Sequence, residues 1–111
     1  MIKLVFVIRR REGMTREEFQ RYWREEHAQL VKRHAGVLRV RRYVQSHTRR
    51  SAYEAGRAPI YDGVAVTWFD DTEAMRASAA TPECARVRAD EGNVITRDPP
   101  FILTTEHPII A

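Results

Sequence analysis

The segment Tyr22–His27 holds the side chain best suited to chemistry, the imidazole of His27. On a helix, His27 lies about 80° around the axis from Phe19, at the edge of an apolar stripe. We therefore expect the imidazole to point into the protein. An imidazole titrates near neutral pH and burial can tune it, which suits a general acid or base. The alternative is a core histidine that makes a single hydrogen bond.

Tyr43, Gln45 and His47 form a second group of polar side chains. Alternate residues of a strand point to the same face, so the three should lie in a row. Such a row suits the polar wall of a pocket, with Gln45 as a substrate-binding residue. Tyr43 could donate to a carbonyl or enolate oxygen, and His47 could carry a proton. An exposed strand face would carry the same pattern, so that alternative stays open.

Three further residues are candidates for contact with a substrate. Trp23 belongs to the same helical stripe as His27, and we expect it to line the same site. The ring of Trp68 could stack on a flat ligand, or it could be a large core residue. Glu91, beside Asp90 near the end of a helical region, could pair with a pocket histidine and raise its basicity. The alternative for Glu91 is a solvated helix end.

Other kinds of site are not supported by the residue spacing. His27 and His34 are too far apart for a two-ligand helical metal site, and no carboxylate recurs beside them at ligand spacing, so we expect no metal. Cys84 follows Pro82 at a helix start, but it has no base nearby in the sequence and is expected to be a buried, inert thiol. The chain has no glycine-rich loop for phosphate.

The composition indicates one globular domain spanning residues 1–111. Apolar residues make up 43% and charged residues 31% of the chain, which argues against disorder. No apolar run approaches the roughly 18 residues that a membrane span requires. A single cysteine excludes an intrachain disulfide and makes the reducing cytoplasm the expected location. The net charge of +4 comes mainly from arginines that alternate with glutamates or lie in turns, so we expect no nucleic-acid partner.

The elements that must position these residues follow from periodicity and helix caps. A capping box at Thr15 and Glu18 starts a long helix at about Arg16, which ends near Gly36. An Asp at 70 or 71 starts a second helix over residues 72–79, and Thr81-Pro82 starts a third segment that ends near Gly92. Strands are predicted at residues 2–8, 37–47, 61–69 and 101–107, and residues 48–59 form a loop. In the second strand, Leu38 and Val40 should lie on the face opposite Tyr43.

The order βαββαβ predicts an α+β fold of the ferredoxin-like type. In this arrangement a four-stranded antiparallel sheet carries both helices on one face. The other face of the sheet has no helix to cover its apolar residues. A partner sheet is the natural cover, so we expect a homodimer that associates through the sheets.

Several segments together resemble the EthD-like family of the dimeric α/β-barrel superfamily. They are Tyr22-Trp23-Arg24-Glu25-Glu26-His27-Ala28, Arg42-Tyr43-Val44-Gln45-Ser46-His47, Tyr61-Asp62-Gly63-Val64, Trp68-Phe69-Asp70-Asp71 and Glu106-His107-Pro108-Ile109-Ile110. The resemblance covers almost the whole chain in the right order. It implies a pocket between the sheet and the helices of each protomer, lined by His27, Tyr43, His47 and Trp68. The chain departs from many members at Ser46, where they carry Asn, and at Val66, where they carry an acidic residue.

Relatives of this fold include muconolactone-type isomerases, aromatic polyketide cyclases and cofactor-free quinone-forming monooxygenases. The resemblance therefore implies a cofactor-independent enzyme of the isomerase, cyclase or lyase type that acts on a small cyclic or aromatic carbonyl compound by acid–base chemistry. His27 would be the base, Tyr43 and His47 would hold the enolate oxygen, and Trp68 would pack on the ring. Two alternatives remain: a monooxygenase of phenols or anthrones, and a non-catalytic accessory protein that binds a small metabolite.

Overall fold

A computed structural model describes residues 1–111 and contains one four-stranded sheet. The strands are β1 (Ile2–Ile8), β2 (Arg42–His47), β3 (Gly63–Phe69) and β4 (Phe101–Thr104). They lie in the order β2-β3-β1-β4, and every neighbouring pair is antiparallel. This topology confirms the predicted ferredoxin-like arrangement.

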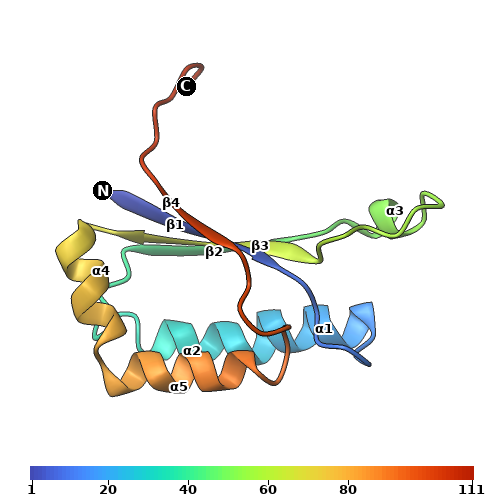
Figure 1. Cartoon of the computed structure of the whole chain (residues 1–111), viewed down its shortest axis with the longest axis horizontal. Coiled ribbons are helices and arrows are strands. Elements are labelled where there is room, and N and C mark those ends of the chain that lie inside the picture. The colour runs from blue at the N-terminus through green and yellow to red at the C-terminus, as the bar shows by residue number, and fades with distance from the viewer.

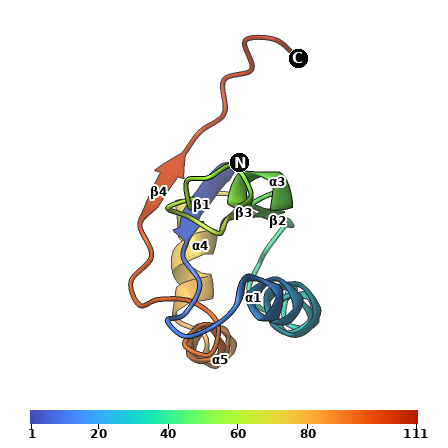
Figure 2. The ribbon, with the colours of Figure 1, turned by 90° about the vertical axis from the view of Figure 1, so that its right-hand side faces the viewer.

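The main helices lie together on one face of the sheet (Figure 1). α1 (Arg16–Tyr22), the π-helical segment η1 (Trp23–His27) and α2 (Ala28–Arg33) follow one another without a break. α4 (Thr72–Ala79) and α5 (Pro82–Glu91) complete this layer, and Figure 2 shows α5 beside the long helix. The short α3 (Arg50–Tyr53) lies within the segment predicted to be a loop.

Helices α1 and α4 begin where their capping residues predicted. The Thr15 hydroxyl accepts a hydrogen bond from the Glu18 backbone N–H at 3.1 Å. Asp71 caps α4 by accepting from the Ala74 N–H at 2.8 Å. Each cap satisfies a backbone donor that the first helical turn leaves unpaired.

The second strand is shorter than predicted because the chain first makes a helix-ending turn. Leu38 N–H donates to the His34 carbonyl, Val40 N–H donates to the Ala35 carbonyl, and Arg39 adopts a left-handed φ of 55°. The chain therefore enters β2 only at Arg42. The predicted alternation of faces from Leu38 onward is wrong, since Leu38 and Val40 line the same cavity as Tyr43.

The two faces of the sheet differ in what covers them. On the helical side, a buried core joins residues of β1 and β3 to the long helix and to the segment after α5: Ile8, Phe19, Trp23, Ala65, Val94 and Ile95. On the other side, Val44, Val66, Val5 and Ile102 are paired across the four strands in one row. No helix covers this row (Figure 1).

The distance between the long helix and the sheet is set at Gly63. A β-carbon built at Gly63 would lie 2.6 Å from the Trp23 ring and 2.7 Å from the Ser46 carbonyl oxygen. Real side chains do not approach so closely. Only glycine therefore lets the indole of Trp23, which is 2% exposed, lie directly against β3.

We predict that Gly63→Ala lowers the free energy of unfolding by about 1–3 kcal/mol, because the added methyl overpacks a rigid contact. Urea denaturation of the two proteins measures the difference. Gly36→Ala is the matched control, since a β-carbon there meets no atom within 4 Å. Equal stability of the two variants would contradict the role assigned to Gly63.

Candidate active site

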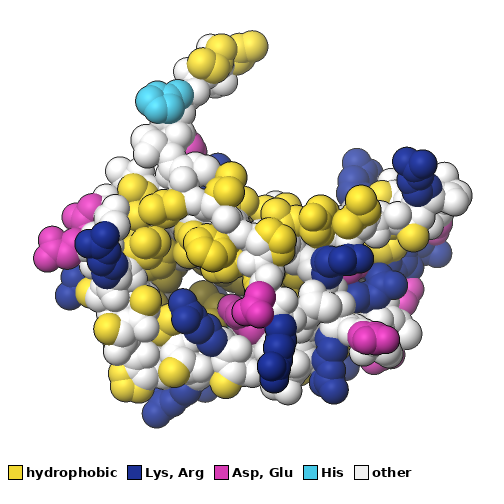
Figure 3. Space-filling model, viewed as in Figure 1, with side chains coloured by type: hydrophobic (Ala, Val, Ile, Leu, Met, Phe, Trp, Pro, Cys, Tyr) yellow, Lys and Arg dark blue, Asp and Glu magenta, His cyan; other side chains and the backbone are white.

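A mostly apolar cavity of about 130 Å³ lies between the sheet and the helices. Figure 3 shows apolar atoms in a hollow between these two layers. Side chains that can exchange a proton lie in its wall, among them His27 from η1, Tyr43 from β2 and Glu91 from α5. An apolar cavity of about 150 Å³ can hold benzene, so this one suits a single small ring.

His27 forms a hydrogen-bonded pair with Asp90 of α5. His27 Nδ1 lies 2.8 Å from Asp90 Oδ2, and the imidazole is buried. The other carboxylate oxygen, Oδ1, accepts from the Tyr22 hydroxyl at 2.6 Å and from Asn93 Nδ2 at 3.3 Å. Asp90 is therefore held from both sides, and it in turn fixes the plane of the imidazole.

The charge of Asp90 decides which imidazole nitrogen is free. Burial raises the pKa of Asp90, but hydrogen bonds from Tyr22, His27 and Asn93 outweigh burial and leave the pKa below its ordinary value. The ionised carboxylate accepts from Nδ1–H, so Nε2 of a neutral His27 carries the lone pair.

His27 Nε2 opens on the cavity. It has no hydrogen-bond partner in the protein, although every side-chain N or O atom sealed from solvent has one. The atom must therefore border open space, and the cavity is the space that His27 lines. A carboxylate behind the imidazole and a free nitrogen in front form the arrangement of a general base.

The π-helical segment brings His27 to this position. Phe19, Trp23, His27 and Val31 recur every four residues, and all four are buried. Steps of four drift around an α-helix that has 3.6 residues per turn. The wider turn of η1 reduces this drift, so that the four side chains stay on the face toward the sheet. By their steps of three and four residues, Leu30 and His34 are predicted to continue this stripe after His27, but the buried residue there is Val31.

Tyr43 presents a phenol to the cavity and is held by Gln45. Gln45 Nε2 donates to the Trp23 carbonyl at 2.8 Å and to the Tyr43 hydroxyl at 3.2 Å. Burial raises the pKa of Tyr43 to about 12, so the phenol keeps its proton at neutral pH. Because the oxygen accepts from Gln45, the hydroxyl hydrogen is free to bond a ligand oxygen.

His47 lies outside the cavity, although it shares the strand face of Tyr43. Its ring packs against the indole of Trp23, with centroids 4.7 Å apart, and its Nε2 lies 2.9 Å from Gln45 Oε1. Burial, together with the charge of Arg24, lowers the pKa of His47, which is therefore neutral at pH 7. The structure does not bring His47 to a substrate. It places His47 and Gln45 behind Tyr43.

Trp68 also lies away from the cavity, contrary to the expectation that it packs on a ring there. Thr67 and Phe69 line the cavity, so Trp68 between them points to the opposite face of the sheet. There it donates to Glu106 at 3.2 Å and lies against Lys3 and Arg42. Alternation along the strand predicts that Trp68 shares a face with Val64 and Val66, but it does not indicate which face the helices cover.

Glu91 lines the cavity but does not pair with His27, because Asp90 takes that place. Its carboxyl group has no hydrogen-bond partner. Burial raises the pKa of Glu91 to about 7, since the charge of Arg88, which would lower it, does not compensate. Neighbouring residues of α5 thus carry carboxyl groups with opposite pKa shifts.

Cys84 was expected to be buried, but it lines the cavity and is only half-buried.

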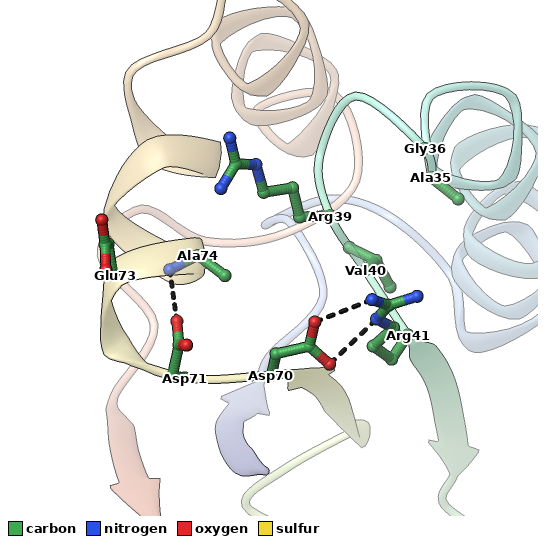
Figure 4. Close-up of a pocket in the computed structure, with 9 residues that line it drawn as sticks. All are labelled: Ala35, Gly36, Arg39, Val40, Arg41, Asp70, Asp71, Glu73 and Ala74. Atoms are coloured by element: carbon green, nitrogen blue, oxygen red, sulfur yellow. Dashed lines mark hydrogen bonds and ion pairs between the residues drawn. The ribbon is translucent and has the colours of Figure 1, made fainter.

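A larger, polar depression of about 520 Å³ lies near the start of α4 (Figure 4). In it, Arg41 is bound to Asp70 through two hydrogen bonds and Asp71 caps α4. None of the candidate residues lines the polar depression.

No helix has the length and apolar character needed to cross a membrane, and no three His, Cys, Asp or Glu side chains converge as metal ligands.

The model of the EthD domain matches residues 11–98. The chain belongs to the EthD family. No curated protein matches it in sequence. Among solved structures, an EthD family protein from Bacillus halodurans superposes with a TM-score of 0.70 at 16% identity, covering 96% of this chain and 99% of its own.

Two further structures share the fold of this EthD chain. A dimeric ferredoxin-like protein from Thermobifida fusca has a TM-score of 0.67 at 17% identity, covering 95% of this chain and 90% of its own. A protein described as an antibiotic biosynthesis monooxygenase has a TM-score of 0.62 at 15% identity, covering 97% and 100%. At these identities the similarity establishes the fold.

The raised pKa of Glu91 predicts a pH-dependent effect of Glu91→Gln on stability. Between its ordinary pKa of 4.5 and about 7, the folded state holds a proton that the unfolded state has lost, so stability falls as pH rises through this window. Glu91→Gln removes this loss of stability, because glutamine does not titrate. We expect its stability relative to wild type to rise by about 2 kcal/mol from pH 5 to pH 8. Urea denaturation at both pH values measures it.

Glu83→Gln is the control for this measurement, because Glu83 lies on the same helix but does not line the cavity. Its difference from wild type should change much less between the two pH values. A Glu91→Gln difference that is the same at pH 5 and pH 8 would show that Glu91 is not buried as described.

Proposed function

We propose that this EthD protein is a cofactor-independent enzyme that moves a proton on a small cyclic or aromatic carbonyl compound. The observation that carries the proposal is the pair formed by His27 and Asp90, with Nε2 free beside an apolar cavity. A base in that position can remove a proton from the carbon next to a carbonyl. Positioned acid–base groups typically contribute about 10²–10⁴-fold to a rate.

Tyr43 supplies the complementary group. As the base removes the proton, negative charge develops on the carbonyl oxygen. A phenol with a free hydrogen can donate to that oxygen and stabilise the enolate. Gln45 holds the phenol in place through a hydrogen bond to its oxygen, and His47 holds Gln45. His47 therefore acts as a positioning residue in this proposal.

The size and polarity of the cavity support the substrate class. Its walls are formed largely by apolar residues of the sheet and helices, including Leu4, Phe6, Val87 and Val94. A volume of about 130 Å³ fits one six-membered ring better than a fused ring system. The proposed substrate is a single-ring compound whose carbonyl oxygen faces Tyr43.

A second candidate function uses the same cavity. The similarity in fold to a protein described as an antibiotic biosynthesis monooxygenase favours it. In that case the base would ionise a phenol, and the electron-rich ring would react directly with oxygen. The two functions differ in their need for oxygen, which proton transfer does not consume. A non-catalytic binding protein would take up the ring without exchanging its protons.

The proton-transfer proposal predicts that the protein catalyses exchange of the α-hydrogens of cyclohexanone in D2O, followed by proton NMR. His27→Gln should lower the rate by about 10²–10⁴-fold, because it removes the base. Tyr43→Phe should lower it on the order of 10²-fold, because it removes the donor to the enolate oxygen. The rate should be the same with and without oxygen.

His34→Gln is the matched control, since His34 follows α2 on the same helix but does not line the cavity. This variant should retain the wild-type rate. Exchange that survives in His27→Gln, or is absent in the wild type, would overturn the proposal. Oxygen uptake with a phenol in place of exchange would favour the second function.

We also propose that the open face of the sheet is a homodimer interface. The row formed by Val44, Val66, Val5 and Ile102 is too apolar for a face without a cover. The C-terminal residues 105–111 leave the sheet on this side, away from the helices (Figure 1). Their Ile109 and Ile110 are 91% and 95% exposed. A second copy would cover both, and the similar structure from Thermobifida fusca is described as dimeric.

Val44→Lys should convert the dimer to a monomer in sedimentation velocity, because it places a charge in the apolar row. The monomer should stay folded by circular dichroism, since the position faces away from the core. Val37→Lys is the control: Val37 is 51% exposed and lies outside the sheet. A wild-type monomer, or a dimeric Val44→Lys protein, would refute the interface.

A further inference from the structure

Glu91 is a carboxyl side chain in the cavity that the proposed reaction leaves unused. It lines the cavity with His27 and Tyr43, and its carboxyl group makes no hydrogen bond within the protein. A carboxyl group in an apolar cavity that lacks a partner is costly when it is ionised. The fold nevertheless keeps it there, beside an already complete pair of His27 and Asp90.

The helix geometry separates the two carboxyl groups. Successive residues of a helix diverge by about 100°, so neighbours on α5 point in different directions. Asp90 reaches His27 on η1 and holds the back of the imidazole. Glu91 lies near enough to Tyr43 for its charge to raise the pKa of the phenol, without a hydrogen bond between them. It therefore lies within reach of a ring whose carbonyl oxygen is bound by Tyr43.

We propose that Glu91 is a second proton-transfer residue, which delivers a proton to a carbon of the substrate different from the one that His27 deprotonates. The inference rests on the function proposed above and makes it more specific. A single base must return to the second carbon to move a double bond, whereas a separate acid can deliver a proton there directly. The substrate class would then be cyclic ketones with a double bond one carbon removed from conjugation.

The reaction balances without any oxidant, reductant or metal. For cyclohex-3-enone, His27 Nε2 takes a proton from C2, and the electron pair spreads over the oxygen, C2 and C4. Tyr43 donates a hydrogen bond to the oxygen. The protonated carboxyl group of Glu91 gives its proton to C4, and the double bond comes to lie between C2 and C3. His27 then returns its proton to solvent and Glu91 takes one up, which restores the starting state.

The charged groups around Glu91 suit this role at neutral pH. Arg88 on the same helix favours the ionised form and Asp90 disfavours it. Tyr43 faces Glu91 from the sheet as a neutral phenol, and His27 faces the cavity from η1. Burial dominates, and with a pKa of about 7 the carboxyl group is protonated in roughly half of the molecules at pH 7. Such a group can both give and regain a proton.

The test compares two reactions of the same protein. One is the exchange of cyclohexanone α-hydrogens, which requires only the base, and the other is the conversion of cyclohex-3-enone to cyclohex-2-enone, followed by absorbance of the conjugated product. In Glu91→Gln, the ratio of isomerisation to exchange should fall at least tenfold. The isomerisation rate of the wild type should decline as pH rises through about 7, because Glu91 loses its proton, and Glu91→Gln should abolish that decline.

Deuterium labelling distinguishes a second acid from a single base that acts twice. In D2O, a protonated Glu91 that has exchanged with solvent delivers deuterium to C4, whereas a returning His27 carries over part of the hydrogen from C2. We expect deuterium at C4 in the wild type and partial retention of hydrogen in Glu91→Gln. Glu91→Asp should restore part of the ratio, and Glu83→Gln should behave as wild type.

The outcomes distinguish this inference from the proposal on which it rests. If the wild type exchanges cyclohexanone through His27 but Glu91→Gln leaves the ratio, the pH profile and the label unchanged, the role of Glu91 is refuted alone. If the wild type exchanges nothing, the proposed function is refuted and the role of Glu91 with it.

Discussion

The contact between Trp23 and Gly63 is the constraint on which the cavity depends. An indole lying directly on the backbone of β3 sets how close the long helix comes to the sheet. The Trp23 carbonyl, accepting from Gln45, fixes the helix along the strand as well. His27 follows one π-helical turn later, so its height above the sheet is determined by the same contact. Further along the helix the two layers enclose the cavity.

Electrostatics then differentiates groups that are chemically alike. Asp90 and Glu91 are adjacent carboxyl groups on one helix, yet hydrogen bonds lower the pKa of the first and burial raises the pKa of the second. His27 and His47 differ in their partners: the first is bound to a carboxylate and faces the cavity, and the second is bound to a neutral amide behind it. The cavity thus holds an imidazole and a carboxyl group that burial keeps protonated to a higher pH than in water.

The local rules predicted the fold well and the site in part. Caps at Thr15 and Asp71, and the inward orientation of His27, follow from side-chain chemistry within a few residues. Three features do not. The π-helical turn has no compositional signal, the face of Trp68 depends on which side the helices pack, and the choice between Asp90 and Glu91 depends on the rotation of a weakly amphipathic helix. A stripe repeating every four residues, from Phe19 to Val31, was the one available indication of the π-helical segment.

The distribution of the site over three elements explains how one fold can serve several chemistries. The proton-active groups are held from behind, by Asp90 for the imidazole and by Gln45 for the phenol. The shape of the cavity comes instead from apolar side chains of β1 and α5, such as Phe6 and Val87, which bond to none of these groups. Substitutions there can enlarge or reshape the cavity while the hydrogen bonds behind the site stay intact. Substrate choice can therefore vary independently of the proton-transfer groups.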